Sequence, residues 1–378
     1  MQKNRGKYTI FVFLQTTMTI EELQKRFCPK ETAKMQAFLQ EPKSQQIVQL
    51  NGLVGSSYPL FVSNLAENMT GVHLFALNSR ERAAYFYNDL EKLLNDRNVP
   101  LPNKRVHYLP SSFKRAHNTD EIDNSNVKLR SEIVNKIANH PDGAYIIVTY
   151  PEALAEKVVT PKFLSDNSFV IRQGNEIPTD IFLQFLYEFE YLQEDFVFEP
   201  GQFAWRGNIF DIFSFSEEYP YRIELDGDTI ESIRFFNPET QLSIREEPEI
   251  RIMPKIVSLD KEEQRISLLD FLPPETVLWL ENPKDIGSQI GQLYKTVKEE
   301  FEDDNLEHKN SVDELFIGKR DFDSACTGHL QFHINSKNDS AGQTIDFALK
   351  PQNNFGRSFD YLFLEWIDNM EHGIRSVF

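Results

Sequence analysis

The sequence lacks several features that define well-known classes of protein. It has only two cysteines, Cys28 and Cys326, and their wide separation excludes a disulfide scaffold and fits a reducing compartment. No apolar run approaches the roughly 20 residues that a membrane helix needs. The run from 10 to 14 is also shorter than the roughly 7–15 apolar residues of a signal peptide. The sequence therefore predicts a soluble, cytoplasmic protein with no membrane partner.

Basic residues are also scarce. There are 40 Lys and Arg against 58 Asp and Glu, which gives a formal net charge of −18. This balance excludes a general binder of nucleic acid, because such a protein needs a basic face for the phosphates. The pairs Lys104-Arg105 and Lys114-Arg115 leave a small local patch open, although such pairs are more often solvated loop residues.

Apolar residues, by contrast, are abundant enough for a large core. With 40% hydrophobic residues and 31 Phe in 378 positions, the chain is expected to fold into two or three domains. Between 52 and 158, apolar runs at 72–77 and 144–149 alternate with segments of helical periodicity, which predicts an α/β domain with a parallel sheet. Asn78 is expected to cap the first helix, and the polar segment 110–126 is expected to be a surface loop.

The pattern changes at about residue 169. Residues 203–215, 220–226, 229–236 and 249–253 read as strands, and Asp226-Gly227-Asp228 is typical of a hairpin turn. This region is therefore predicted to be an inserted α+β unit with an antiparallel meander. After it, the apolar run 277–280 predicts another buried strand.

The segment 52–59 stands where a nucleotide-binding domain carries its phosphate loop, but it lacks the groups that bind phosphate. A working loop, G-x-x-x-x-G-K-[ST], uses backbone N–H groups, a lysine and a metal-binding hydroxyl. Gly52 and Gly55 are present, whereas Ser57, Tyr58 and Pro59 replace the second glycine, the lysine and the hydroxyl residue. We therefore expect a turn that binds no nucleotide, and no cofactor.

The second half of such a site is also defective. After the strand 277–280, Glu281 could still contact a metal ion, but Asn282 cannot act as a base. A zinc site at Cys326, His329 and His333 is not expected either, because a fourth ligand is missing and alternation along a strand would point both histidines outward. The sequence therefore predicts neither catalytic residues nor a metal site.

Arginines mark the meander. Arg206, Arg222 and Arg234 fall on three predicted strands, on the side where polar residues alternate with apolar ones. Two interpretations stay open. The side could be a solvated face of arginine–carboxylate pairs, or a protein-docking surface, because arginine is enriched at interface hot spots.

The stretches EPGQF at 199–203, PYRIE at 220–224 and IESIRFFNPETQ at 230–241 resemble the transcription-repair coupling factor (Mfd) family. The resemblance is to the N-terminal module, which is related to the excision-repair protein UvrB, and it covers nearly the whole chain. It implies a degenerate helicase-like α/β domain at 46–167 and a UvrA-binding domain at 168–253. A second α/β part would combine 1–45 with 254–378.

The resemblance also implies a function. In the family, the full-length protein is an ATP-dependent DNA translocase that releases stalled RNA polymerase and recruits UvrA for nucleotide excision repair. Its further domains lie C-terminal to this module, and its own C-terminal domain masks the UvrA-binding surface.

The family's UvrA-contacting arginines correspond to Arg206, which precedes Gly207, and to Arg222. Asp226 stands where some relatives have an aromatic residue. We therefore expect a non-catalytic adaptor whose two arginines face an acidic surface of UvrA. The alternative is a P-loop ATPase or helicase lobe with residual nucleotide binding.

Overall fold

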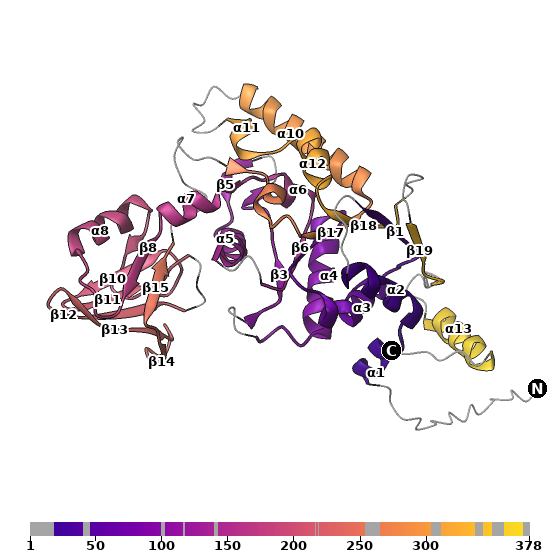
Figure 1. Cartoon of the computed structure of the whole chain (residues 1–378), viewed down its shortest axis with the longest axis horizontal. Coiled ribbons are helices and arrows are strands. Elements are labelled where there is room, and N and C mark those ends of the chain that lie inside the picture. The colour runs from indigo at the N-terminus through magenta and orange to yellow at the C-terminus, as the bar shows by residue number, and fades with distance from the viewer. Residues whose placement is uncertain are drawn as a thin grey trace, which may run out of the picture.

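The computed structural model describes residues 19–40, 46–99, 103–115, 118–139, 143–215, 217, 219–253, 265–303, 311–336, 343–349 and 359–372. Figure 1 shows an α/β body with a smaller, strand-rich unit beside it. The α/β fold class with an inserted antiparallel unit is confirmed by this architecture.

The α/β body is built on a seven-stranded sheet in which every described strand pair is parallel. Its order is β19-β1-β18-β17-β2-β6-β3. The central strands are apolar runs that are buried along their whole length, as expected for a parallel sheet covered on both faces. The strands are β1 (Ile47–Asn51), β2 (Val72–Ala76), β3 (Val106–Tyr108), β6 (Tyr145–Thr149), β17 (Val277–Glu281), β18 (Leu330–Ile334) and β19 (Gln343–Asp346).

This topology corrects the expected division of the chain. Strands from 46–167 and from 254–378 share this sheet and one hydrophobic core, so the described residues do not form two α/β parts. Strand β17 lies between β18 and β2, although some 200 residues separate it from β2 in the sequence. The division was implied by the resemblance, and only the pairing of strands distant in the sequence shows that the two segments share one sheet.

Two groups of helices enclose the sheet in Figure 1. One contains α1 (Ile20–Arg26), α2 (Pro29–Gln40), α3 (Ser57–Leu65) and α4 (Arg80–Leu93). The other contains α6 (Pro151–Ala155), α10 (Pro283–Asp303), α11 (Val312–Leu315) and α12 (Lys319–Cys326). The further elements of the body are η1 (Ala66–Asn68), α5 (Asn124–Asn139), β7 (Val158–Val159), α7 (Pro161–Asp166), β16 (Arg265–Ile266) and α9 (Leu268–Phe271).

Two local predictions for the body are wrong. The cap of α4 is Ser79, whose hydroxyl accepts from the Arg82 N–H, while the backbone N–H of Asn78 donates to Glu281. The expected loop at 110–126 contains a two-stranded hairpin of β4 (Phe113–Arg115) and β5 (Asn118–Ile122). The polar composition of this segment gave no sign of strands. The start of the hairpin is held by Glu156, a residue distant in the sequence, which accepts hydrogen bonds from Ser111 and Ser112.

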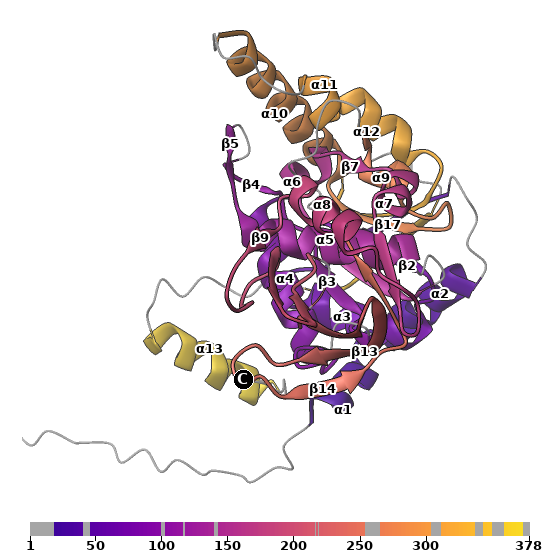
Figure 2. The same cartoon turned by 90° about the vertical axis from the view of Figure 1, so that its left-hand side faces the viewer.

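The inserted unit has a hydrophobic core of its own, drawn from residues between Ile171 and Ile252. Its sheet has six strands in the order β14-β13-β12-β11-β10-β9. Figure 2 labels β9, β13 and β14 of this sheet. One face packs on α8 (Thr179–Glu188), and β8 (Phe169–Arg172) pairs with β15 (Glu249–Ile252) beside it. The strands of the sheet are β9 (Leu192–Gln193), β10 (Gln202–Arg206), β11 (Ile209–Ile212), β12 (Tyr221–Asp226), β13 (Thr229–Phe236) and β14 (Ser243–Glu246).

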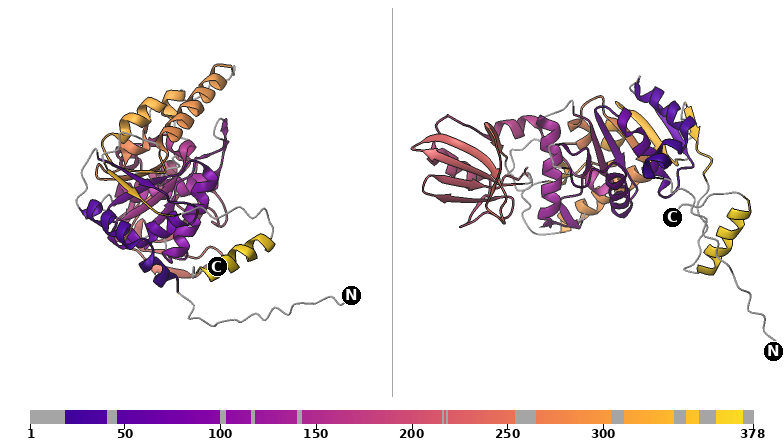
Figure 3. Two further views of the ribbon diagram at one scale, coloured as in Figure 1. Left: turned by 90° about the vertical axis from the view of Figure 1, so that its right-hand side faces the viewer. Right: turned by 90° about the horizontal axis from the view of Figure 1, so that it is seen from below.

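The predicted hairpin turn is present in this sheet. Gly227 has φ +65° between β12 and β13, a conformation that favours glycine. Figure 3 shows the inserted sheet at one end of the molecule and α13 (Phe359–Glu371) at the other. Among the helices described, none combines the length and apolar character that crossing a membrane would require.

Candidate functional site

The loop between β1 and α3 has the backbone of a strand-to-helix turn, closed by its own side chains. Gly52 has φ +86°, and a Cβ there would lie 2.2 Å from the Phe347 carbonyl oxygen, so only glycine fits. Gly55 also has a positive φ, of +53°, but has open space around it. The Ser57 hydroxyl accepts from the Val54 N–H at 2.8 Å, which directs it into the loop itself.

Tyr58 and Pro59, at the positions where a phosphate loop has its lysine and its hydroxyl residue, are both buried in the hydrophobic core. Tyr58 is 4% exposed, and its ring packs against Phe86 with centroids 4.6 Å apart. Pro59 is buried in the first turn of α3 and contributes no N–H. A cavity of about 270 Å³ remains between the loop and α4, lined by Tyr58, Arg82 and Phe86 among others. Burial raises the pKa of the Tyr58 phenol, so it stays neutral.

Glu281 is occupied by a partner from α4. Its carboxylate accepts from Arg82 through both oxygens, with a distance of 2.9 Å to the Arg82 Nε, and from the Asn78 N–H at 3.1 Å. The Glu281 side chain is 7% exposed, whereas that of Arg82 is 57% exposed. Asn282 has φ +49° and donates its side-chain amide to Asp285. The acidic position is therefore neutralised inside the protein.

The residues with a zinc-like pattern do not assemble a site. His329 and His333 are both buried, so the expectation that they point outward is wrong. His333 is on β18, inside a sheet that is covered on both faces, and His329 directly precedes that strand. His329 contacts the Thr276 carbonyl, and His333 contacts the Gln331 side chain. Within the described ranges, no group of three His, Cys, Asp or Glu could hold a metal ion.

The first basic pair is used internally. The Lys104 ammonium pairs with Glu91 and lies 5.7 Å from the centroid of the Tyr87 ring. Arg105 donates to the Ala66 carbonyl at 2.6 Å. Neither group is therefore free to form the local phosphate-binding patch that the sequence left open.

In the inserted sheet, one buried carboxylate holds two arginines. Asp211 is 1% exposed and lies directly across from Arg222 on β12. Arg222 donates Nε and Nη2 to its two oxygens at 2.7 and 2.8 Å, a bidentate pair. Arg206 donates Nη2 to the same carboxylate at 2.5 Å. The Arg206–Asp211–Arg222 cluster therefore carries two positive charges and one negative charge.

The two arginines differ in exposure. The Arg222 side chain is 15% exposed, donates also to Gln241 at 2.8 Å and covers the Phe236 ring, and the hydrogen bond to Asp211 raises its pKa. Arg206 is 40% exposed and donates to the Asp195 carbonyl at 3.1 Å. The expectation that both arginines are held outward is therefore met by Arg206 and corrected for Arg222, which is mostly structural.

The two turns at one end of the sheet lie next to each other. The Asn208 carbonyl accepts from the Leu225 N–H, and the Asn208 side-chain amide donates to the Leu225 carbonyl. These bonds bring Gly207 beside the turn that follows Asp226. Gly207 has φ +63°, and Asp226 is exposed. Arg234 pairs separately with Glu224. Phe213, beyond the other end of β11, contacts Lys128 of α5, so the turns lie away from that contact.

Two exposed aromatic residues near the turn end of the sheet, Phe196 and Trp205, were missed by the sequence reasoning. Phe196 is 50% exposed, and the Arg206 guanidinium lies 4.8 Å from its ring centroid. Trp205 is 41% exposed, stacks on Phe210 and donates its indole N–H to the Gly207 carbonyl at 2.9 Å. Because successive strand residues alternate between faces, Trp205 lies on the α8 side of the sheet, opposite Arg206 and Asp211. Asp211 was missed as well. A single acidic residue inside the apolar run 209–213 was the signal that could have found it.

The first comparison with known proteins concerns the inserted unit. Residues 169–256 match the family model described as "UvrB interaction domain". This range contains the six-stranded sheet, the Asp211 cluster and the aromatic residues beside it.

Two kinds of curated protein resemble the chain. The transcription-repair-coupling factor of Bacillus subtilis (strain 168) is 32% identical over 223 residues, which cover 58% of this chain and 18% of that protein. The UvrABC system protein B of Corynebacterium diphtheriae is 24% identical over 278 residues, which cover 70% of this chain and 39% of that protein. The chain thus spans well under half the length of either. The resemblance to the UvrB-related module of the transcription-repair coupling factor family is confirmed.

Proposed function

We propose that this chain, as a UvrB-like module, is a non-catalytic adaptor that recruits UvrA in DNA repair. The observation that carries the proposal is the Arg206–Asp211–Arg222 cluster within the matched UvrB interaction domain. Asp211 fixes both guanidinium groups, and Arg206 is 40% exposed at the turn end of the sheet. A preorganised arginine beside an exposed aromatic ring, here Phe196, is typical of an interface hot spot.

The surroundings of Arg206 indicate how the partner would contact it. From Gln173 to Trp205 the sequence has seven Asp and Glu and no Lys or Arg. A broadly acidic partner face would therefore be repelled by this segment. We propose instead that UvrA offers a local acceptor to Arg206 and an apolar surface to Phe196, whose ring lies 4.8 Å from the guanidinium. The role of Asp226, an exposed carboxylate at the same end, would be to favour a cation on UvrA.

The second part of the proposal is that the α/β body does not turn over nucleotide. Tyr58 fills the position of the phosphate-binding lysine with a buried ring, and Arg82 neutralises Glu281. In the full-length protein, ATP-driven translocation on double-stranded DNA, displacement of RNA polymerase and masking by the C-terminal domain would then belong to other parts of the chain. A titration with Mg-ATP tests this: we expect an unchanged unfolding temperature, whereas binding at 100 times Kd would stabilise by about 2.7 kcal/mol.

The docking proposal is tested by measuring the affinity of purified UvrA for three variants. Arg206→Ala and Phe196→Ala should each weaken binding by about 2 kcal/mol, the threshold of a hot spot, with little change in stability because both side chains are at least 40% exposed. The matched control is Arg245→Ala on β14, because Arg245 is also about half exposed and pairs with a neighbouring carboxylate, Glu247. Equal affinities of Arg206→Ala and Arg245→Ala for UvrA would contradict the proposed surface.

A further inference from the structure

A second cavity of the α/β body lies at the opposite end of the parallel strands from the closed phosphate loop. It measures about 480 Å³, within the range of roughly 300–1,000 Å³ typical of ligand sites. Helix α9 and the segment after it form one wall, and α12 with the turn after it forms the other. The lining residues are Leu269, Asp270, Leu272, Pro274, Asp321, Ser324, Ala325, Thr327, Gly328 and His329.

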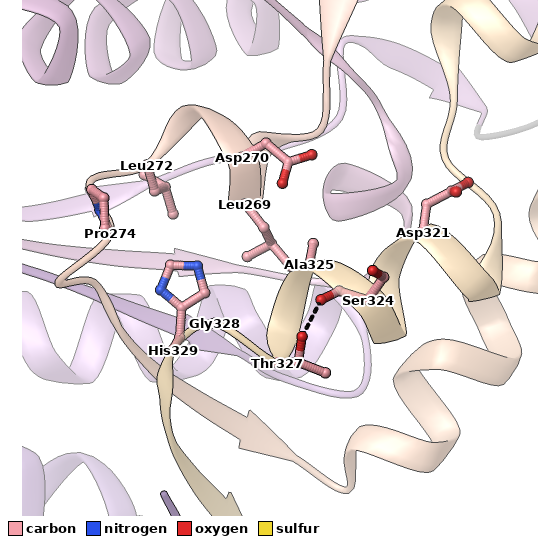
Figure 4. Close-up of a pocket in the computed structure, with 10 residues that line it drawn as sticks. All are labelled: Leu269, Asp270, Leu272, Pro274, Asp321, Ser324, Ala325, Thr327, Gly328 and His329. Atoms are coloured by element: carbon pink, nitrogen blue, oxygen red, sulfur yellow. Dashed lines mark hydrogen bonds between the residues drawn. The ribbon is translucent and has the colours of Figure 1, made fainter. Parts of the chain in front are cut away.

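A buried imidazole supplies an acceptor at one end of this cavity. His329 is 7% exposed, and its Nδ1 lies 3.0 Å from the Thr276 carbonyl oxygen. A carbonyl accepts only from an N–H, so in the neutral ring Nδ1 carries the proton and Nε2 keeps its lone pair. Among the residues that the structure describes, no hydrogen-bond partner of this Nε2 is found. The ring lines the cavity beside Leu272 and Pro274 (Figure 4).

Two carboxylates lie at the other end, and an apolar strip separates them from the imidazole. Figure 4 shows Asp270 on α9 and Asp321 on α12 beyond Leu269 and Ala325. Asp321 accepts from the Gly318 N–H at the start of α12, which leaves acceptor capacity on the carboxylate. Lys319 of the same helix pairs with Asp323 instead. Along the cavity, the His329 acceptor is therefore followed by the apolar residues Leu269 and Ala325 and then by the carboxylates of Asp270 and Asp321.

We propose that this cavity binds an arginine residue in a segment of another protein. The guanidinium would lie between the carboxylates of Asp270 and Asp321, which its planar fork of donors suits better than an ammonium would. The methylene stem would cover Leu269 and Ala325, and a peptide N–H would donate to the His329 Nε2. The site lies outside the inserted sheet, so it is independent of the proposed UvrA surface.

The test is an NMR titration of the whole chain with N-acetyl-arginine amide, which follows the His329 ring and the Thr327 and Gly328 amides. We expect saturable shifts for this probe and none for N-acetyl-citrulline amide, the uncharged analogue. The double variant Asp270→Asn/Asp321→Asn should weaken binding at least tenfold while keeping the unfolding temperature. Equal shifts with both probes, or unchanged affinity of the double variant, would overturn the proposal.

A second variant keeps the test decisive if the double variant is unstable. Ser324→Arg places a guanidinium in the cavity from an exposed position of α12 and retains both carboxylates. We expect it to abolish binding of the probe, and retained binding would argue against the site. Free arginine that binds more tightly than the capped amide would overturn the assignment to a protein segment.

Discussion

The α/β body and the inserted sheet both pair arginine with a buried carboxylate, but with different outcomes. Each contains a buried carboxylate held by arginine: Glu281 with Arg82 in the body, and Asp211 with Arg206 and Arg222 in the insert. In the body, one arginine meets one carboxylate, and the charges cancel. In the insert, two arginines share one carboxylate, so a positive charge is left over and is held in place.

The surroundings widen this difference. Beside Arg82, the ring of Tyr58 packs inward on Phe86, so the aromatic group closes the site. Beside Arg206, the ring of Phe196 stays half exposed, so the aromatic group adds to the exposed surface. An arginine–carboxylate pair therefore does not indicate a function by itself. The charge balance and the exposure of the neighbouring rings decide it.

The largest difference between the two regions should be in how much stability each loses as the pH is lowered. Burial lowers the pKa of His73 to about 4, of His107 to about 3 and of His333 to about 4, from 6.5. The unfolded chain therefore binds more protons, so stability present above pH 6.5 is lost as the pH falls toward 4. The loss should be on the order of 2 kcal/mol for each histidine by pH 5.

All three histidines are in the α/β body, and residues 169–253 contain no histidine. Lowering the pH from 7 to 5 should therefore reduce the free energy of unfolding of the body much more than that of the insert. Urea unfolding at the two pH values measures this difference. Single-tryptophan variants distinguish the two, because Trp279 is buried in the body and Trp205 lies in the insert. Equal losses reported by the two tryptophans would contradict the assignment.

Removing the shared carboxylate should have the next largest effect. Asp211→Ala leaves the mostly buried Arg222 without its bidentate partner, and breaking a buried pair costs about 3–5 kcal/mol. The fluorescence of Trp205 during urea unfolding measures the loss. Asp226→Ala, which removes an exposed carboxylate of the same sheet, is the control and should change stability by less than about 0.5 kcal/mol.

The corresponding change in the body should cost less. Arg82→Ala leaves Glu281 with the Asn78 N–H, but Arg82 is 57% exposed and solvent already screens its charge. We expect a loss of about 1–2 kcal/mol, monitored by Trp279. A cost as large as that of Asp211→Ala would show that the two carboxylates are equally dependent on their partners.

The smallest effect should come from the phenol of Tyr58. Its hydroxyl is buried and has no hydrogen-bond partner among the described residues. Tyr58→Phe removes an unsatisfied group and keeps the ring, so we expect it to stabilise the body by up to about 1 kcal/mol. Tyr58→Ala should instead cost about 3–5 kcal/mol through the cavity that it leaves. A destabilising Tyr58→Phe would indicate a hydrogen bond that the packing does not explain.

Several features of the fold could be predicted from the sequence because they depend on local patterns of residues. The buried runs at 72–77 and 277–280, the turn at Gly227 and the degenerate loop at Ser57–Pro59 each depend on a few neighbouring residues. Periodicity and steric limits act at that range, so the α/β strands, the meander and the replacement of the phosphate-binding residues could be read from it.

What the sequence left undecided depends on contacts between distant segments. Only the folded sheet joins β17 to β2, brings Asp211 between Arg206 and Arg222, and buries His329. Whether a charged side chain is free or paired is set by neighbours across the strands, since the free energy of burying a charge depends on its partner. For that reason residue type alone could nominate Arg222, and tertiary structure alone could show it to be mostly enclosed.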